Sequence, residues 1–278
     1  MLKLGKFQFL TAGRVSNHGI YLRSDDGGGE VLLPNKLKPD GLVTGGRIEV
    51  FVYNDSEDRL VATTRRPLLE LGQYATLRAV DTNRIGAFFD WGLEKDLLVP
   101  FREQSRPIEE GEWHVVHLFL DQHTERLVGT TRISRTLSTI GIQVAEGEPV
   151  AVLPYHTSDL GINVIVENRY AGLIFHNEAH QQVEIGRELK GYVKAIRADG
   201  KLDISLRPPG RQAVLDSSDV IMEAIRANGG HLPLNDKSPP ELISQQLGVS
   251  KKVFKQAIGK LYRERRIVIE DDGVRLLG

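Results

Sequence analysis

The chain has 278 residues, in which 36 Lys and Arg nearly balance 37 Asp and Glu, and it contains no cysteine. Its length predicts two or more domains, and 40% apolar with 26% charged residues is typical of a globular protein. The absence of cysteine excludes disulfides, thiolate metal sites and a cysteine nucleophile, and it fits a reducing cytoplasm. The net charge of −1 argues against a uniformly basic surface.

The beginning of the chain has no targeting pattern. Residues 1–13 include Lys3 and Lys6 but no sustained apolar core, so we expect no secretory signal peptide. No stretch approaches the roughly 20 apolar residues that span a bilayer. We therefore expect a cytoplasmic protein with no membrane partner.

Three segments of the chain repeat the same order of strand-like patterns. Each starts with a glycine before alternating residues, continues through an apolar run and a β-branched stretch, and closes on a strand that ends in arginine. Gly19 and Gly86 are 67 positions apart, and Gly86 and Gly161 are 75 apart. The closing arginines keep both spacings: Arg65, Arg132 and Arg207. This shared register predicts three repeated units.

Each unit has about five short strand patterns with turn signals between them, which predicts a small barrel. Five strands in roughly 65 residues match the size of an OB-fold. We place the units at residues 1–66, 67–140 and 145–210. Period-two alternation places Tyr21 and Phe88 at matching outward positions of the first two units.

The last part of the chain has helical rather than strand-like patterns. A first helix is predicted to begin at a cap formed by residues 216–218. A second is predicted to begin at Pro240, with Ser238 and Glu241 as a capping box. Ser250 is expected to cap a third helix, whose apolar positions repeat every fourth residue.

A hairpin is predicted after these helices, because residues 271–273 read Asp-Asp-Gly between two apolar runs. Three helices followed by a hairpin predict an α+β winged helix-turn-helix at residues 213–278. The fold class is therefore mainly β and multidomain: three tandem five-stranded OB-fold barrels and a winged helix.

Two sets of residues carry a family resemblance. The third unit, with its strings at 171–174 (AGLI), 191–196 (GYVKAI) and 203–206 (DISL), resembles the RNA-binding repeat of ribosomal protein S1. The strings at 86–100 (GAFFDWGLEKDLLVP) and 250–262 (SKKVFKQAIGKLY), in that order around a third repeat, resemble the bacterial CvfB family, also called YitL or conserved virulence factor B. This resemblance covers essentially the whole chain. It implies a cytoplasmic RNA-binding protein that influences gene expression and has no catalytic activity of its own.

Outward aromatic side chains are the candidates for base stacking. Tyr21 and Phe88 stand where the S1-type pattern has a stacking aromatic. Asn163 replaces that aromatic in the third unit, and Phe175 on the following strand is expected to compensate. The alternative is that these rings pack against a neighbouring domain.

Charge is distributed unevenly among the four units, whose net charges are +2, −3, −2 and +1 in chain order. Residues 250–266 hold seven cations against Glu264 alone, which predicts a phosphate-binding surface, with a solvated helix face as the alternative. The third unit adds outward cations close to it in the sequence. The predicted RNA-binding cations are Lys190, Lys194, Arg197, Lys201, Arg207, Lys251, Lys252, Lys255, Arg263, Arg265 and Arg266. The acidic second unit is expected to be a spacer or an interaction surface.

The leading hypothesis is a non-catalytic protein that binds single-stranded RNA by aromatic stacking and a Lys/Arg track, and that regulates gene expression post-transcriptionally. No nucleophile–base arrangement is present, and we expect no catalytic residues, metal, cofactor or small-molecule substrate. Two alternatives stay open. One is a double-stranded DNA-binding regulator that uses helix 250–263, and the other is a protein-interaction scaffold on the ribosome or RNA polymerase.

Overall fold

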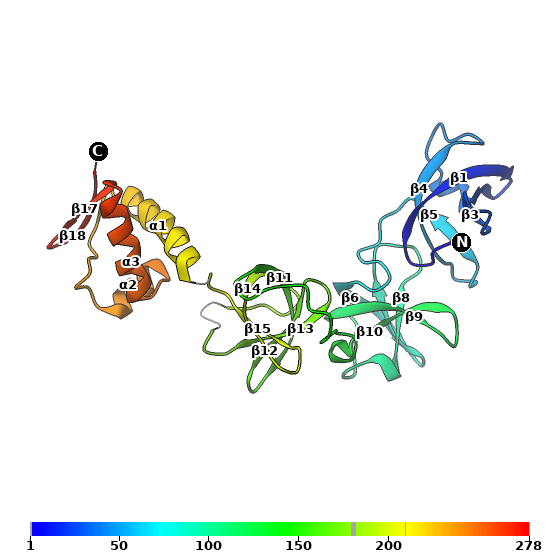
Figure 1. Ribbon diagram of the computed structural model, residues 1–278. Coiled ribbons are helices and arrows are strands. Elements are labelled where there is room, and N and C mark those ends of the chain that lie inside the picture. The colour runs from blue at the N-terminus through cyan, green and yellow to red at the C-terminus, as the bar shows by residue number, and fades with distance from the viewer. Residues whose placement is uncertain (1, 179–181, 209, 278) are drawn as a thin grey trace.

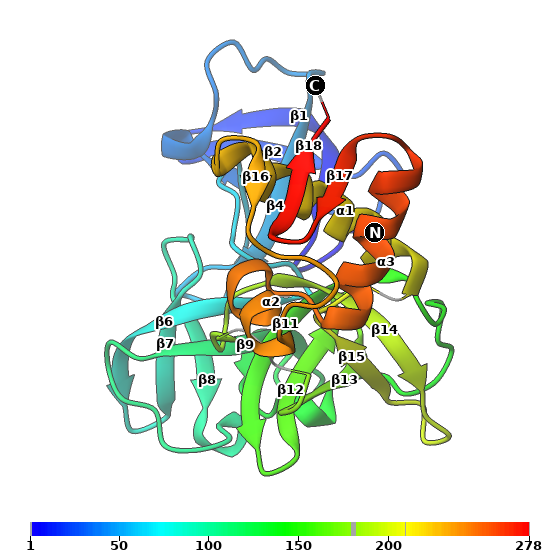
Figure 2. The same ribbon diagram turned by 90° about the vertical axis from the view of Figure 1, so that its left-hand side faces the viewer.

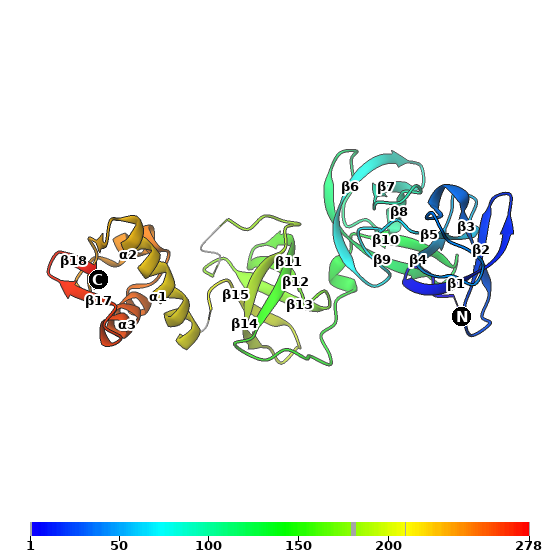
Figure 3. The ribbon, with the colours of Figure 1, turned by 90° about the horizontal axis from the view of Figure 1, so that it is seen from above.

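The computed structural model describes residues 2–178, 182–208 and 210–277, and in its first helix it describes the side chains from Ser217 onward. Three β units follow one another in chain order, and a helical domain lies beyond the third (Figure 1). Viewed from above, the helical domain is at the opposite end of the molecule from the first unit (Figure 3). Among the described helices, none has the length and apolar character required to cross a bilayer.

The first unit is a closed barrel in the order β1-β2-β3-β5-β4. Its strands are β1 (Phe7–Ser16), β2 (Gly19–Arg23), β3 (Glu30–Pro34), β4 (Arg47–Asn54) and β5 (Leu60–Thr63), with the 3-10 turn η1 (Asn35–Leu37) after β3. The pairs are antiparallel except β3–β5, which is parallel and meets at Leu32 and Val61. Leu10, Leu22 and Val50 are among the side chains buried inside.

The second unit has the same strand neighbours but is open at one seam. Its strands are β6 (Tyr74–Asn83), β7 (Gly86–Asp90), β8 (Leu97–Pro100), β9 (Trp113–Asp121) and β10 (Arg126–Thr130), with 3-10 turns η2 (Phe101–Glu103) and η3 (Ile133–Arg135). The order β10-β9-β6-β7-β8 leaves β8 and β10 adjacent without ladder hydrogen bonds in the described chain. This seam corresponds to the parallel pair of the first barrel, the weaker kind of pairing.

The third unit is again closed, in the order β11-β12-β13-β15-β14. Its strands are β11 (Pro149–Ser158), β12 (Gly161–Val166), β13 (Tyr170–Phe175), β14 (Leu189–Ile196) and β15 (Leu202–Ser205). The expected fold of three repeated five-stranded units is therefore confirmed, with the second unit as a sheet that is not fully closed.

The repeated glycine has a steric reason in each unit. Gly19, Gly86 and Gly161 each begin the second strand of their unit, close to the backbone of the next strand. A Cβ atom at these positions would lie only 2.1, 2.3 and 2.1 Å from a carbonyl oxygen of that strand. Any side chain would therefore force the two strands apart.

The C-terminal domain is a winged helix with its own core. Its elements are α1 (Gly210–Ala227), β16 (His231–Leu232), α2 (Pro240–Leu247), α3 (Lys251–Arg263), β17 (Ile267–Glu270) and β18 (Gly273–Leu276). Ile225, Phe254 and Leu261 are fully buried between the helices and the sheet. Figure 2, with this domain toward the viewer, shows the β17–β18 hairpin beside α3.

Two of the predicted caps in this domain are wrong. Helix α1 begins at Gly210, so residues 216–218 lie inside it, and the polar side chains of Ser217 and Ser218 are buried. Helix α2 does begin at Pro240, but no side chain caps it, because the Ser238 hydroxyl accepts a hydrogen bond from the Asn235 amide instead (2.9 Å).

The other two predictions for this domain are confirmed. The Ser250 hydroxyl accepts from the Val253 amide at the start of α3 (3.4 Å). The two-residue Asp271–Asp272 turn joins β17 to β18 and so forms the predicted hairpin. The short strand β16, which pairs with β18, has no signal in the sequence pattern because it is only two residues long.

Side-chain contacts hold neighbouring barrels against one another. Phe51 and Tyr53 of β4 lie edge-on to Trp91 of the second unit, and their ring centroids are 5.9 and 6.3 Å, respectively, from the centroid of Trp91. The second and third units meet where the Thr76 hydroxyl donates to the carbonyl oxygen of Gly186 (2.5 Å). The first two units thus share one hydrophobic cluster, whereas the core of the winged helix includes no barrel residue among the described side chains.

Candidate nucleic-acid interface

The three predicted stacking aromatics lie on equivalent faces of their barrels, and each is partly buried. Tyr21 is on β2, and the guanidinium carbon of Arg14 stands 3.4 Å from its ring centroid. Phe175 ends β13, with Arg197 at 5.3 Å. Both rings therefore carry a cation on a face, which pairs a stacking surface with a phosphate-binding group.

Phe88 on β7 has a different environment, because it lines a cleft between the first and second units. The cleft has a volume of about 470 Å³. One wall is the β4–β5 turn of the first barrel, residues 54–58, and the other is the sheet of the second unit. Trp91, only 3% exposed, and the apolar side chains of Leu97 and Val128 complete the lining.

Ionic contacts across this cleft attach the first barrel to the second. The Lys95 ammonium donates to the carbonyl oxygen of Asp55 (2.7 Å) and lies 3.4 Å from the carboxylate of Asp58. The other oxygen of Asp58 accepts from Arg126 (2.5 Å). Lys95 and Arg126 of the second unit are thus both paired with a turn of the first.

Carboxylates form the largest group among the remaining polar side chains of the cleft, and the hydroxyls of Tyr53 and Ser56 also line it. Burial, together with the nearby charges of Asp90 and Asp81, raises the pKa of Asp96 above its ordinary value. The Oδ1 atom of Asn54 is buried and has no hydrogen-bond partner in the described part of the chain. The indole N–H of Trp91 is already donated to the carbonyl oxygen of Lys95 (2.6 Å). The carboxylates of this cleft therefore favour a ligand that supplies donors.

On the third barrel Arg197 lies over the Phe175 ring, and three of the five predicted cations are paired with acids. Lys194 contacts Glu178, which raises the lysine pKa, and Arg197 contacts Asp203, both at 2.5 Å. Surface pairs of this kind are weak and exchange readily for phosphate. Lys201 lies 3.4 Å from Asp199, Lys190 stands 5.4 Å from the Tyr192 ring, and Arg207 is partly buried.

On the winged helix, Lys252 and Arg265 are exposed and make no ion pair with any described residue. Tertiary structure brings Asp236 to 3.7 Å from Lys255, so the excess of positive charge on α3 is smaller than its sequence indicates. The other predicted cations contact oxygen atoms of their own domain. These contacts are Lys251 to the Lys237 carbonyl (3.5 Å), Arg263 to the Gly259 carbonyl (3.2 Å) and Arg266 to Glu264 (3.6 Å).

Comparison with known proteins gives two domain matches. Residues 219–276 match the CvfB-like winged helix domain, and residues 4–65 match the S1 domain. Proteins called conserved virulence factor B from Staphylococcus haemolyticus and Staphylococcus aureus are each 25% identical over 281 aligned positions, which cover 98% of this chain and 94% of theirs. The expected resemblance to the CvfB family is confirmed.

A solved structure also aligns with nearly the whole chain. It is described as a multidomain protein with nucleic acid binding domains from Streptococcus pneumoniae. The two chains are 23% identical, the TM-score is 0.44, and the alignment covers 99% of this chain and 98% of the other.

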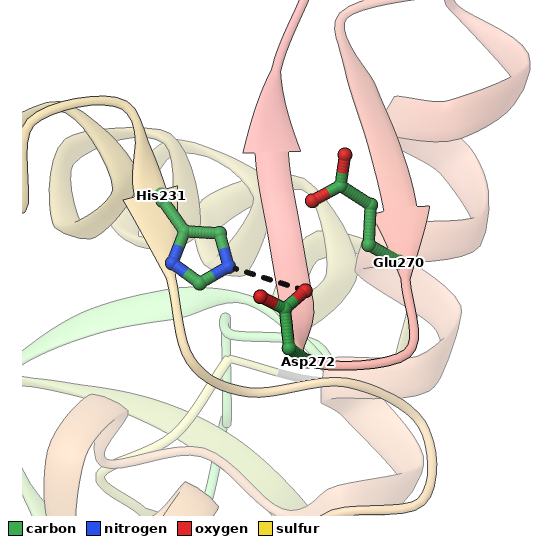
Figure 4. Close-up of side chains that lie close together, drawn as sticks. All are labelled: His231, Glu270 and Asp272. Atoms are coloured by element: carbon green, nitrogen blue, oxygen red, sulfur yellow. Dashed lines mark ion pairs between the residues drawn. The ribbon is translucent and has the colours of Figure 1, made fainter.

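One group of side chains outside these surfaces has the composition of a metal site. His231, Glu270 and Asp272 meet where β16 reaches the turn of the hairpin (Figure 4). The carboxylate of Glu270 is engaged by Arg275 at 3.1 Å, and Asp272 is largely exposed. His231 Nε2 lies 3.6 Å from Asp272 Oδ1, an ion-pair distance longer than a hydrogen bond. Of the two carboxylates, that of Glu270 is thus paired with Arg275 and that of Asp272 lies mostly in solvent.

Sequence reasoning missed the residues that make the cleft. Asn54, Asp58 and Lys95 belong to turns that read as ordinary polar connections. The only available signal was the acidic composition of residues 55–58 opposite the Lys95 and Arg126 cations. Nothing in the repeat pattern says that a turn of one barrel lies on the face of the next.

Proposed function

We propose that this protein binds single-stranded RNA and regulates gene expression post-transcriptionally, without catalysing a reaction. The observation that carries the proposal is that Lys252 on α3 and Arg265 in the turn after it are exposed and form no ion pair with a described residue. Together with the Arg197–Phe175 pair of the third barrel, they supply phosphate contacts and a stacking surface.

The order of the domains supports the same function. The S1 match and the winged-helix match both fall in folds that present such surfaces to nucleic acids. The third barrel is the one next to the winged helix (Figure 1), so its cations and those of α3 lie on adjacent domains. We infer that one RNA strand contacts both.

The test is a salt titration with a fluorescently labelled single-stranded RNA, read by anisotropy. Affinity is expected to fall with salt, because phosphate contacts release counterions. Replacing Lys252 and Arg265 by Ala is expected to lower the slope of log affinity against log salt by about 2, since each contact contributes about 1.

The matched control replaces two exposed cations outside the proposed surface, Lys38→Ala and Arg135→Ala, which leaves the same net charge and is expected to keep the wild-type slope. Equal slopes for both double variants would contradict the proposal. Tighter binding of duplex DNA than of single-stranded RNA would favour the DNA-binding alternative. Unchanged RNA affinity with lost binding to ribosomes or RNA polymerase would favour the scaffold.

A further inference from the structure

The cleft between the first two barrels has features that the proposed phosphate contacts do not use. We propose that it binds one unpaired base of the RNA and selects bases that carry an exocyclic amino group. This inference rests on the proposed function, since the base belongs to the bound strand. It assigns a role to the second unit, whose charge composition indicates a spacer or an interaction surface.

The size and lining of the cleft fit a base. Its volume of about 470 Å³ lies within the range of small-ligand pockets in proteins, about 300–1,000 Å³. Phe88 offers a ring at the equivalent position of Tyr21, and no guanidinium covers it among the described residues. The apolar walls formed by Trp91 and Leu97 exclude water around a stacked ring.

Acidic groups beside the cations of the cleft disfavour the RNA backbone there. Lys95 and Arg126 contact the carbonyl oxygen of Asp55 and the carboxylate of Asp58, so a phosphate that approached these cations would also meet the Asp58 carboxylate. Asp96 on the same wall repels an anion further. A base turned out of the strand can enter because it is uncharged and planar.

Carboxylates predominate among the polar groups of the cleft, beside the hydroxyls of Tyr53 and Ser56. The carboxylates of Asp96 and Asp81 can accept hydrogen bonds from a base. Cytosine and adenine present an amino group on their Watson–Crick edge, and guanine presents an amino group and a ring N–H. Uracil has one ring N–H between two carbonyl oxygens, which these acceptors oppose. The cleft therefore favours cytosine, adenine or guanine over uracil.

The protein carries its own reporter for this site. It has two tryptophans, of which Trp91 lines the cleft and Trp113 is 65% exposed on β9. In Trp113→Phe protein the emission of Trp91 reports cleft occupancy. Anisotropy of a labelled RNA reports binding anywhere on the chain. The two RNAs to compare are a uridine ten-mer and the same ten-mer with one central cytidine.

We expect both RNAs to raise the anisotropy, but only the cytidine-containing RNA to change Trp91 emission. The cytidine-containing RNA should bind about tenfold more tightly than the uridine ten-mer, because its amino group donates a hydrogen bond to a charged group. Asp96→Asn is expected to reduce that preference to about twofold or less, and Phe88→Leu to abolish the change in emission. Phe101→Leu, at an exposed phenylalanine of the second unit outside the cleft lining, is the matched control and is expected to keep both the preference and the change in emission.

The outcomes separate the two proposals. Normal RNA binding with equal affinity for both RNAs and unchanged Trp91 emission overturns the base-binding cleft and leaves the proposed function standing. If neither RNA binds, the proposed function fails, and cytidine, which carries no phosphate, then tests the cleft by itself. The site is supported if cytidine changes Trp91 emission and Phe88→Leu abolishes that change. No change in emission with cytidine overturns it.

Discussion

The carboxylate of Glu112, on the segment before β9, is held by several donors at once. It lies 2.9 Å from Nε2 of His114, accepts from the Glu109 amide (3.1 Å) and pairs with Arg106 (3.1 Å). Chiefly through the contact with His114, these groups lower the pKa of Glu112 to about 2. A carboxylate whose pKa is lower in the folded than in the unfolded state stabilises the fold above its unfolded pKa of about 4.3.

This stabilisation is lost as the pH falls from about 4.5 toward 2. We therefore predict that Glu112→Gln lowers the free energy of unfolding at pH 7 by about 1 kcal/mol, since partial exposure screens the contacts. The difference from wild type should shrink at pH 3, which urea denaturation at the two pH values measures. Glu110→Gln, an exposed neighbour, is the control, and a Glu112→Gln deficit that is the same at both pH values would contradict the assignment.

At the scale of the element, helix α3 shows how a local signal and a buried face act together. Ser250 caps its first turn, and Phe254, Ala257, Ile258 and Leu261 form its buried side. The cap satisfies one backbone N–H that the helix itself cannot bond, and burial of the apolar face supplies the larger share of stability. By contrast, α1 begins without the predicted cap because its buried serines belong to the helix interior.

Removal of the cap on α3 should therefore be measurable but not severe. Ser250→Ala is expected to destabilise the winged helix by about 1 kcal/mol. Ser250→Asp restores the acceptor and should recover most of the loss. Chemical denaturation followed by far-ultraviolet circular dichroism measures both, and equal loss in the two variants would show that the hydroxyl does not act as a cap.

At the scale of the whole molecule, the four domains are not joined equally. The first two barrels share a hydrophobic cluster through Phe51, Tyr53 and Trp91, and ion pairs cross the cleft beside it. The winged helix packs on its own core and follows the third barrel through a short connection. Domains that share a core unfold together, whereas a domain with a separate core unfolds independently.

Calorimetry should therefore resolve the winged helix from the first two barrels. Leu261 is fully buried in the winged helix, and Leu261→Ala is expected to cost about 2–5 kcal/mol there. Only the winged-helix transition should move to lower temperature. A parallel shift of every transition would instead mean that the domains unfold as one unit.

The amino-acid sequence by itself determined the fold of each unit. The patterns that predicted it are local: period-two alternation, the glycines at 19, 86 and 161, and the signals of the third helix. The glycines, for example, are required because a Cβ there would meet the next strand. The candidate aromatics on the barrels were likewise visible in one strand at a time. Sequence could not show that Asp236 lies against Lys255, because charge counted along a helix omits partners from other segments.

Only the tertiary structure decided what surrounds those aromatics. Tyr21 and Phe88 have equivalent positions in equivalent strands, yet Arg14 covers one ring and a cleft opens beside the other. The difference arises because a turn of the first barrel packs on the sheet of the second and neutralises Lys95 and Arg126. Contacts between domains depend on how whole surfaces fit, and a pattern that repeats in each domain carries no information about that fit.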